Sequence, residues 1–172
     1  MRLRAHGALL WWQRDSCNRS GDVTRFAVVL VLALTALCQS ARATPVDTLF
    51  QDFGLLGSWA QHCKTPAAPD NPHVSITAPT PGTVLEEHDL GPNYAVNSYR
   101  MLSAERTAPD ELSVETIFQP GTTAEERQKL VFRVRDNTRR TMFNQPDNGP
   151  VRVKDGVVVG RDIRTPVLKK CD

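Results

Sequence analysis

The stretch Leu112-Ser-Val-Glu-Thr-Ile-Phe-Gln-Pro-Gly121 decides the fold class. Its alternate residues Leu112, Val114, Thr116 and Phe118 form one set, and a Pro-Gly pair ends the run. Successive side chains of a β-strand point to opposite faces, so this period of two predicts a half-buried strand with that set facing inward. The Pro-Gly pair predicts a turn directly after it.

The same alternation, separated by turn residues, recurs along most of the chain. Residues 151–160 read Val-Arg-Val-Lys-Asp-Gly-Val-Val-Val-Gly, and Asp155-Gly156 predicts a type I′ hairpin turn. Further strands are expected at residues 74–77, 83–88, 94–103, 130–135, 140–144 and 167–171. Short strands spaced by roughly 8 to 12 residues predict a mainly β protein. We expect an antiparallel up-and-down barrel of about eight strands, with a β-sandwich as the alternative.

A short helix is expected to precede the strands, within residues 44–54. Pro45 is suited to a helix start and Gly54 to a helix end. Leu49, Phe50 and Phe53 would share one apolar face. Residues 65–72 contain three prolines and predict a surface loop.

The segment before this domain is typical of a secretory signal. Residues 26–37 are uncharged and nearly all apolar, they follow Arg25, and small residues stand at Ala41 and Ala43. We expect cleavage after Ala43, which divides the chain into a leader (1–43) and a single domain (44–172). The apolar run is short for a transmembrane span, so the mature chain is expected to be periplasmic or secreted and not membrane-spanning.

Loss of the leader changes the charge balance. It removes six of the 21 Lys and Arg residues but only two of the 19 Asp and Glu residues, so the net charge changes from +2 to −2. A slightly acidic domain lacks the basic footprint of nucleic-acid-binding proteins, and we expect no nucleic-acid partner.

Two of the four cysteines, Cys63 and Cys171, belong to the mature chain. In an oxidising compartment an even pair predicts a disulfide, which would join the start of the domain to its last residues. Two free thiols are the alternative.

The tripeptide Gly57-Ser-Trp59, placed after a predicted short helix, resembles the G-x-W opening of lipocalin-like (calycin) barrels. The resemblance implies that Trp59 packs across the closed end of the barrel, with Arg161 or Arg164 covering its ring. It also implies a small apolar ligand in the barrel mouth, or inhibition of an extracytoplasmic enzyme through a loop. Residues 53–63 are similar as well to small exported proteins of Gram-negative bacteria, which implies no particular activity.

Residues 86–89, Glu-Glu-His-Asp, are the first candidate for chemistry. On a strand, Glu86 and His88 would share a face and could supply two metal ligands, but a third would have to come from elsewhere. Consecutive acids at a strand end are more often a solvated rim. Nucleophile elbows and phosphate loops are absent from the sequence, so we expect no enzyme activity, catalytic residue or cofactor. A periplasmic metal-dependent hydrolase is the alternative.

The second candidate is a basic cluster in and after the strand at residues 130–135. Its members are Lys129, Arg133, Arg135, Arg139 and Arg140, preceded by Arg127. We interpret it either as a solvated face neutralised by neighbouring acids or as a docking surface for an anionic envelope component. The sequence thus predicts an exported non-enzymatic binding protein for a small apolar ligand, an envelope component or a protein partner.

Overall fold

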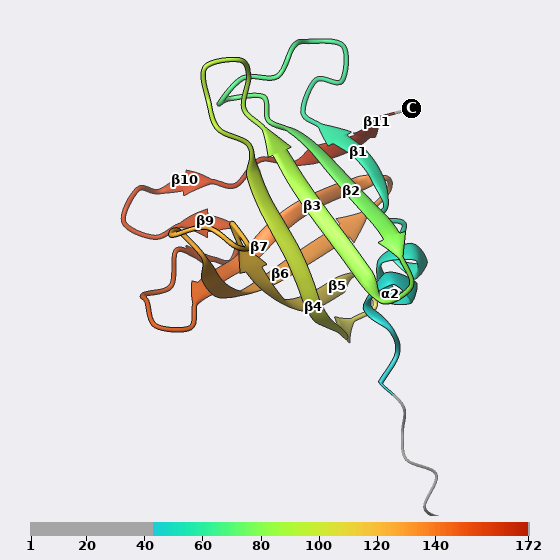
Figure 1. Cartoon of the computed structure of the whole chain (residues 1–172). Helices are drawn as coiled ribbons and strands as arrows, with labels where there is room; N and C mark the ends of the chain where they lie inside the picture. Colours follow the sequence, from blue (N-terminus) through green and yellow to red (C-terminus); the bar gives the residue numbers. More distant parts are fainter. Residues whose placement is uncertain (1–42, 172) are drawn as a thin grey trace, which may run out of the picture. The chain divides into compact units, whose positions relative to one another are not determined.

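The computed structural model describes residues 43–171 (Figure 1), so the predicted leader lies outside the described residues except for Ala43. The first element in this range is the helix α2 (Val46–Asp52), which follows Pro45 with φ −55°. Gly54, two residues beyond the helix, has a left-handed φ of +64° and turns the chain away from the helix axis. The N–H of Leu55 then donates to the carbonyl of Phe50 at 2.8 Å. This is a Schellman motif, so the predicted helix and both of its ends are confirmed.

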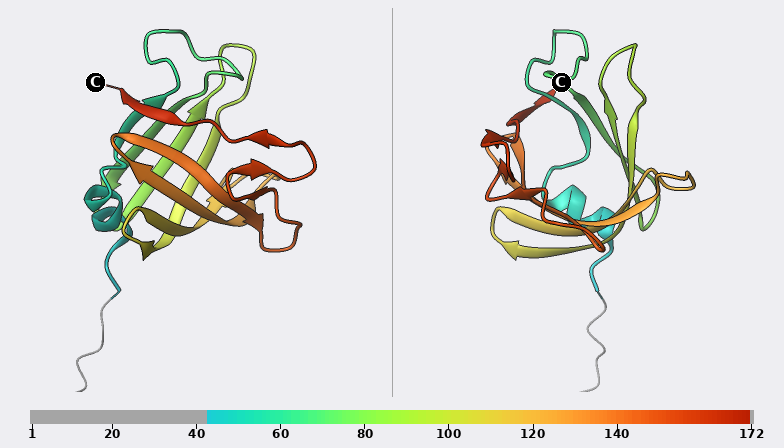
Figure 2. Two further views of the ribbon diagram at one scale, coloured as in Figure 1. Left: turned by 180° about the vertical axis from the view of Figure 1, so that it is seen from behind. Right: turned by 90° about the vertical axis from the view of Figure 1, so that its left-hand side faces the viewer.

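Eight antiparallel strands form a closed barrel, so the barrel prediction is confirmed over the sandwich. They are β1 (Gly57–Ala60), β2 (His73–Thr80), β3 (Thr83–Asp89), β4 (Asn97–Ala108), β5 (Glu111–Phe118), β6 (Glu126–Arg135), β7 (Thr138–Pro146) and β11 (Leu168–Cys171). Strands β1 to β7 each pair with the next, and β11 closes the barrel by pairing with both β7 and β1. Figures 1 and 2 show the resulting wall.

Three two-residue strands lie outside this wall and project from β7 (Figure 1). They are β8 (Val153–Lys154), β9 (Val157–Val158) and β10 (Ile163–Arg164). We call residues 153–164 the flap. Asp155 and Gly156 have φ of 52° and 72°, which confirms the predicted type I′ turn between β8 and β9. The flap arises because β7 changes its partner along its length. Its first residues pair with β11, whereas Asn144, near the end of β7, pairs with Val153 of β8.

The predicted disulfide is present. Cys63 and Cys171 are bonded, with their Cα atoms 5.6 Å apart and a sequence separation of 108. Cys171 lies opposite Ser58 of β1, so the bridge fastens the loop after β1 to the neighbouring last strand.

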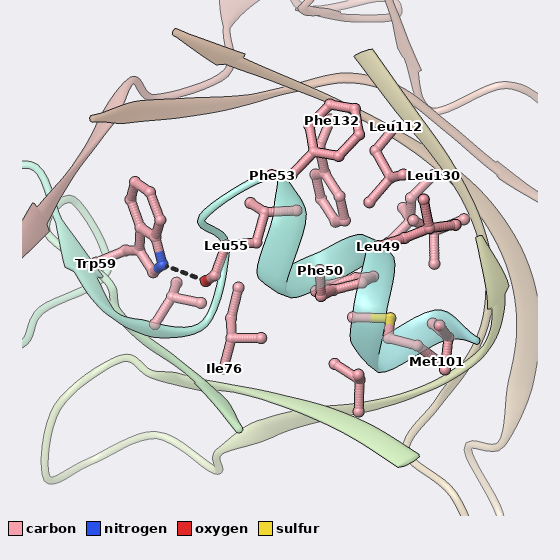
Figure 3. Close-up of a cluster of buried hydrophobic side chains, with 14 of the residues drawn as sticks. Leu49, Phe50, Phe53, Leu55, Trp59, Ile76, Met101, Leu112, Leu130 and Phe132 are labelled. Atoms are coloured by element: carbon pink, nitrogen blue, oxygen red, sulfur yellow. Dashed lines mark hydrogen bonds between the residues drawn. The ribbon is translucent and has the colours of Figure 1, made fainter. Parts of the chain in front are cut away.

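The apolar core occupies the end of the barrel at which α2 lies (Figures 2 and 3). The helix directs Leu49, Phe50 and Phe53 into a cluster with inward residues of the strands, among them Leu112 and Phe132. The interior of this end of the barrel is therefore filled with side chains.

Candidate functional site at the barrel mouth

Inward positions change from apolar to polar along the barrel axis. On β3, Val84 belongs to the core, but Glu86 is buried at the next inward position and His88 follows it. On β6, Leu130 is followed toward the same end by the buried Gln128. In the half of the barrel away from α2, polar side chains therefore lie in the interior beside apolar ones such as Trp59 and Val74.

The centre of this polar interior is an ion pair between Glu86 and Arg139. The guanidinium donates from both terminal nitrogens to the two carboxylate oxygens at 3.1 and 2.6 Å. The side chains are only 2% and 3% exposed. His88 Nε2 lies 2.6 Å from Glu86 Oε1, and Arg139 lies over the ring of Phe132 at 4.6 Å. Burial alone would raise the pKa of Glu86, but Arg139 and His88 together lower it to about 2. The carboxylate is therefore ionised and neutralised by Arg139.

A second set of polar contacts runs from Asn144 of β7 through β6 to Arg152, the exposed residue before the flap. Asn144 Nδ2 donates to Gln128 Oε1 at 2.9 Å, and Gln128 Nε2 donates to Glu126 Oε2 at 2.8 Å. Arg152 then pairs with Glu126 through two hydrogen bonds of 2.8 and 2.9 Å. Burial raises the pKa of the nearby Tyr99, as does the charge of Glu86. Tyr99 therefore stays protonated at neutral pH.

A hollow of about 220 Å³ lies beside the ion pair, between the barrel wall and the base of the flap. Its walls include the apolar residues Pro72, Val74, Val153, Pro166 and Leu168. Its polar lining consists of His88, Arg139, Arg140, Thr141, Asn144 and Thr165. We call this space the mouth hollow.

The structure corrects the interpretation of Glu86 as part of a solvated rim. Glu87 and Asp89 are exposed, but Glu86 is buried because the alternation of β3 turns it inward. Glu86 and His88 do share a face, as the metal hypothesis required. However, the Arg139 guanidinium occupies the side of the carboxylate that a metal ion would need. Residues 43–171 contain no cluster of three or more metal-binding side chains.

The basic cluster is divided between the two faces of the sheet. Lys129, Arg133 and Arg135 point outward from β6 as expected, and Arg133 and Arg135 pair with Glu111 and Asp110. Contact with Arg135 lowers the pKa of Asp110.

The assignment of Arg139 and Arg140 to that docking surface is wrong. Arg139 pairs in register with the inward Val134 and lies in the barrel interior. Arg140 donates to the carbonyl of Gly156 and to Thr165 Oγ1, so it fastens the flap.

Trp59 is buried in the core, and its Nε1 donates to the carbonyl of Leu55 at 2.8 Å (Figure 3). Gly57 opens the same strand with φ +117°. The predicted cover by Arg161 or Arg164 is wrong, because both arginines are exposed in the flap and β10 pairs only with β9. Lys170 lies over the ring instead, with Nζ 5.6 Å from the centroid, because its strand β11 is the neighbour of β1.

The roles of Gln128 and Asn144 and the inward position of Arg139 were not predicted from the sequence. A signal for Arg139 was present: Asp136 and Asn137 form a two-residue turn with positive φ at both positions, which places Val134 opposite Arg139 on one face. A polar residue at an inward position of an alternating strand, such as Gln128, is the corresponding signal for the polar interior.

Within residues 43–171, no helix is long and apolar enough to cross a membrane. Comparisons of the chain with protein-family models, with curated proteins and with solved structures found no match.

Proposed function

We propose that this chain is a non-enzymatic binding protein that holds one small, mostly apolar ligand in the mouth hollow. The observation that carries the proposal is an apolar wall beside a polar floor, in which Arg139 is neutralised by Glu86 and Arg140 is held by the Gly156 carbonyl and Thr165 Oγ1. Val74, Val153 and Leu168 offer hydrophobic contact, and the Glu86–Arg139 pair contributes no net charge.

The size of the mouth hollow limits the ligand. Pockets for drug-sized molecules measure about 300–1,000 Å³, whereas the mouth hollow measures about 220 Å³. The filled core around α2 leaves the ligand at the mouth and away from the barrel centre. The ligand, or the part of it that enters, is therefore the size of a single aromatic ring system or a short alkyl chain.

Binding is preferred over hydrolysis because of how Glu86 is held. Arg139 and His88 engage its carboxylate, and the pKa of Glu86 is about 2, well below the range useful for a general acid or base near neutral pH. We further propose that the protein acts outside the cytoplasm. The disulfide between Cys63 and Cys171 supports this compartment because such bonds persist where the surroundings are oxidising.

The test is ligand-observed NMR with indole and n-hexanol as probes, on the oxidised domain. Val153→Phe fills the mouth hollow and should abolish saturation transfer to both probes. Val159→Phe adds the same volume at an exposed flap position and should leave binding unchanged. Absence of binding by the unmodified protein, or equal loss in both variants, would contradict the proposed site.

A further inference from the structure

The flap is attached to the barrel by few buried contacts. Within residues 153–164, only Val153 and Gly156 are buried, and the tip from Val159 to Asp162 is exposed. Segments with few buried apolar contacts and exposed backbone hydrogen bonds open locally at a low cost in free energy. The apolar core lies at the other end of the barrel, so we expect the flap to open while the barrel wall stays folded.

The two ends of the flap form one side of the mouth hollow. Val153 begins the flap and lines the hollow, and Thr165 and Pro166, which directly follow the flap, line it as well. A movement of the flap away from β7 therefore displaces a wall of the hollow and widens the path into it.

One side chain, Arg140 of β7, holds the flap at its turn and at its end. Its guanidinium donates to the carbonyl of Gly156 at 2.5 Å and to Thr165 Oγ1 at 3.1 Å. Two further bonds join the same residues to β7: the N–H of Gly156 donates to the Met142 carbonyl at 2.9 Å, and Thr165 Oγ1 donates to the Thr141 carbonyl at 2.7 Å. Among residues 43–171, Arg140 has no carboxylate within 4 Å, so its charge is held by neutral acceptors. We call Arg140, Gly156 and Thr165 the latch.

Gly156 allows the guanidinium to approach the turn closely. Its φ is 72°, and a Cβ atom at this position would lie 2.8 Å from Cζ of Arg140. Any other residue at position 156 would therefore push the guanidinium away. A hydrogen bond from a charged donor is stronger than one between neutral groups, so loss of the Arg140 contact should free the flap more than loss of an ordinary turn bond.

We infer that the flap is a lid over the mouth hollow and that the latch controls how often the lid opens. This inference rests on the proposed function and adds the control of ligand entry and release to it. A ligand that enters and leaves only while the lid is open has association and dissociation rates that are both proportional to the open fraction. Loosening the latch should therefore raise both rates and leave the dissociation constant nearly unchanged.

Hydrogen exchange of backbone amides, followed by NMR on the oxidised protein, tests the latch. The amides of residues 156 and 165 donate bonds that hold the flap closed. Arg140→Met should accelerate their exchange by roughly 10- to 100-fold, the range expected for loss of hydrogen bonds to a charged group, and leave the amides of β5 unchanged. Arg133→Met is the matched control, because Arg133 lies opposite Arg140 on β6 and pairs with Glu111. It should leave exchange in the flap unchanged.

Gly156→Ala tests the lid, because Gly156 belongs to the latch but does not line the mouth hollow. NMR line shapes in titrations with indole give the association and dissociation rates, and both should rise by about tenfold. Gly160→Ala is the matched control. Gly160 also has a left-handed φ, 79°, but no atom lies within 4 Å of where its Cβ would stand. This variant introduces similar backbone strain without displacing Arg140, so both rates should stay the same.

The outcomes separate failure of the lid from failure of the proposed function. Unchanged amide exchange in Arg140→Met, or equal acceleration in Arg133→Met, would overturn the latch. Faster exchange in the flap of Gly156→Ala with unchanged binding rates would overturn the lid, and so would equal rates in Gly156→Ala and Gly160→Ala. All of these results leave a ligand in the mouth hollow. Absence of indole binding to the unmodified protein would overturn the proposed function, and the lid with it.

Discussion

The contact between Glu86 and Arg139 shows how single residues shape the barrel interior. On folding, the carboxylate of Glu86 and the guanidinium of Arg139 are both removed from water and form two hydrogen bonds with each other. Because both side chains are almost completely buried, water cannot solvate either charge if the other is removed. Replacing one member leaves the other buried and uncompensated, which costs far more than replacing both.

Arg139→Met should therefore lower the free energy of unfolding by about 3–5 kcal/mol. The double variant Glu86→Met/Arg139→Met should be less destabilised than Arg139→Met alone, because no isolated charge remains in it. Arg135→Met removes the exposed partner of Asp110 and should have little effect. Urea titrations of the three variants provide the measurement. Equal losses for Arg139→Met and Arg135→Met would show that the buried pair is not energetically distinct.

Glu86 is also expected to make the stability of the domain depend on pH. Glu86 has a pKa of about 2 in the folded protein against an ordinary value of 4.5, so the unfolded state binds its proton first as the pH falls. This contribution to stability is complete above pH 4.5 and is lost as the pH falls toward 2. The loss attributable to Glu86 should be on the order of 3 kcal/mol. Glu86→Gln should show a correspondingly shallower decline in urea titrations across this interval. Parallel pH profiles for the two proteins would contradict the lowered pKa.

At the scale of elements, α2 depends on how it ends. Gly54 has a left-handed backbone, and the bond from Leu55 to Phe50 directs the chain from the helix into β1. No atom lies within 4 Å of where a Cβ at Gly54 would stand, so only backbone conformation restricts this position.

Gly54→Ala should destabilise the domain by about 1–2 kcal/mol, and Gly54→Asn by less, since asparagine tolerates the left-handed region better. Thermal unfolding of the two variants, followed by circular dichroism, measures the difference. If alanine and asparagine cost the same, the backbone explanation is wrong.

Some strands and turns could be predicted from the sequence, and others could not. The period of two at residues 112–118 and the Asp155-Gly156 turn were sufficient to predict a strand and a hairpin, because both signals are local. The strand expected from residue 94 begins only at Asn97, and β4 continues to Ala108 through residues without clean alternation. The exit of the flap from β7 depends on which strand pairs with each half of β7, and this choice between distant segments leaves no local trace.

At the scale of the whole molecule, the disulfide lies at the pair of strands that closes the barrel, β1 and β11. Cys63 follows β1 and Cys171 ends β11, so the bridge spans the pair of strands that joins the beginning of the domain to its end. The cysteine count predicted this bond without any knowledge of the register. The mouth hollow could not be predicted in that way, because its walls come from five strands, β2, β3, β7, β8 and β11, and from the segments that precede β2 and β11.

The variant Cys63→Ser/Cys171→Ser should lose about 4–5 kcal/mol of stability, because a loop of this length is no longer closed in the unfolded chain. Urea titrations with and without a reductant measure the effect. The reductant should destabilise the natural protein and leave the double variant unchanged. A double variant as stable as the oxidised natural protein would show that hydrogen bonding alone closes the barrel.

The position of β11 has a consequence for the order of events during synthesis. Of the strands in the wall, β11 is synthesised last, yet it pairs with both β7 and β1. Until residues 168–171 leave the ribosome, the earlier strands can form only an open sheet with two unpaired margins, which invite association with other chains. The barrel can therefore close only after β11 has been made. The disulfide between Cys171 of this strand and Cys63 can form only then.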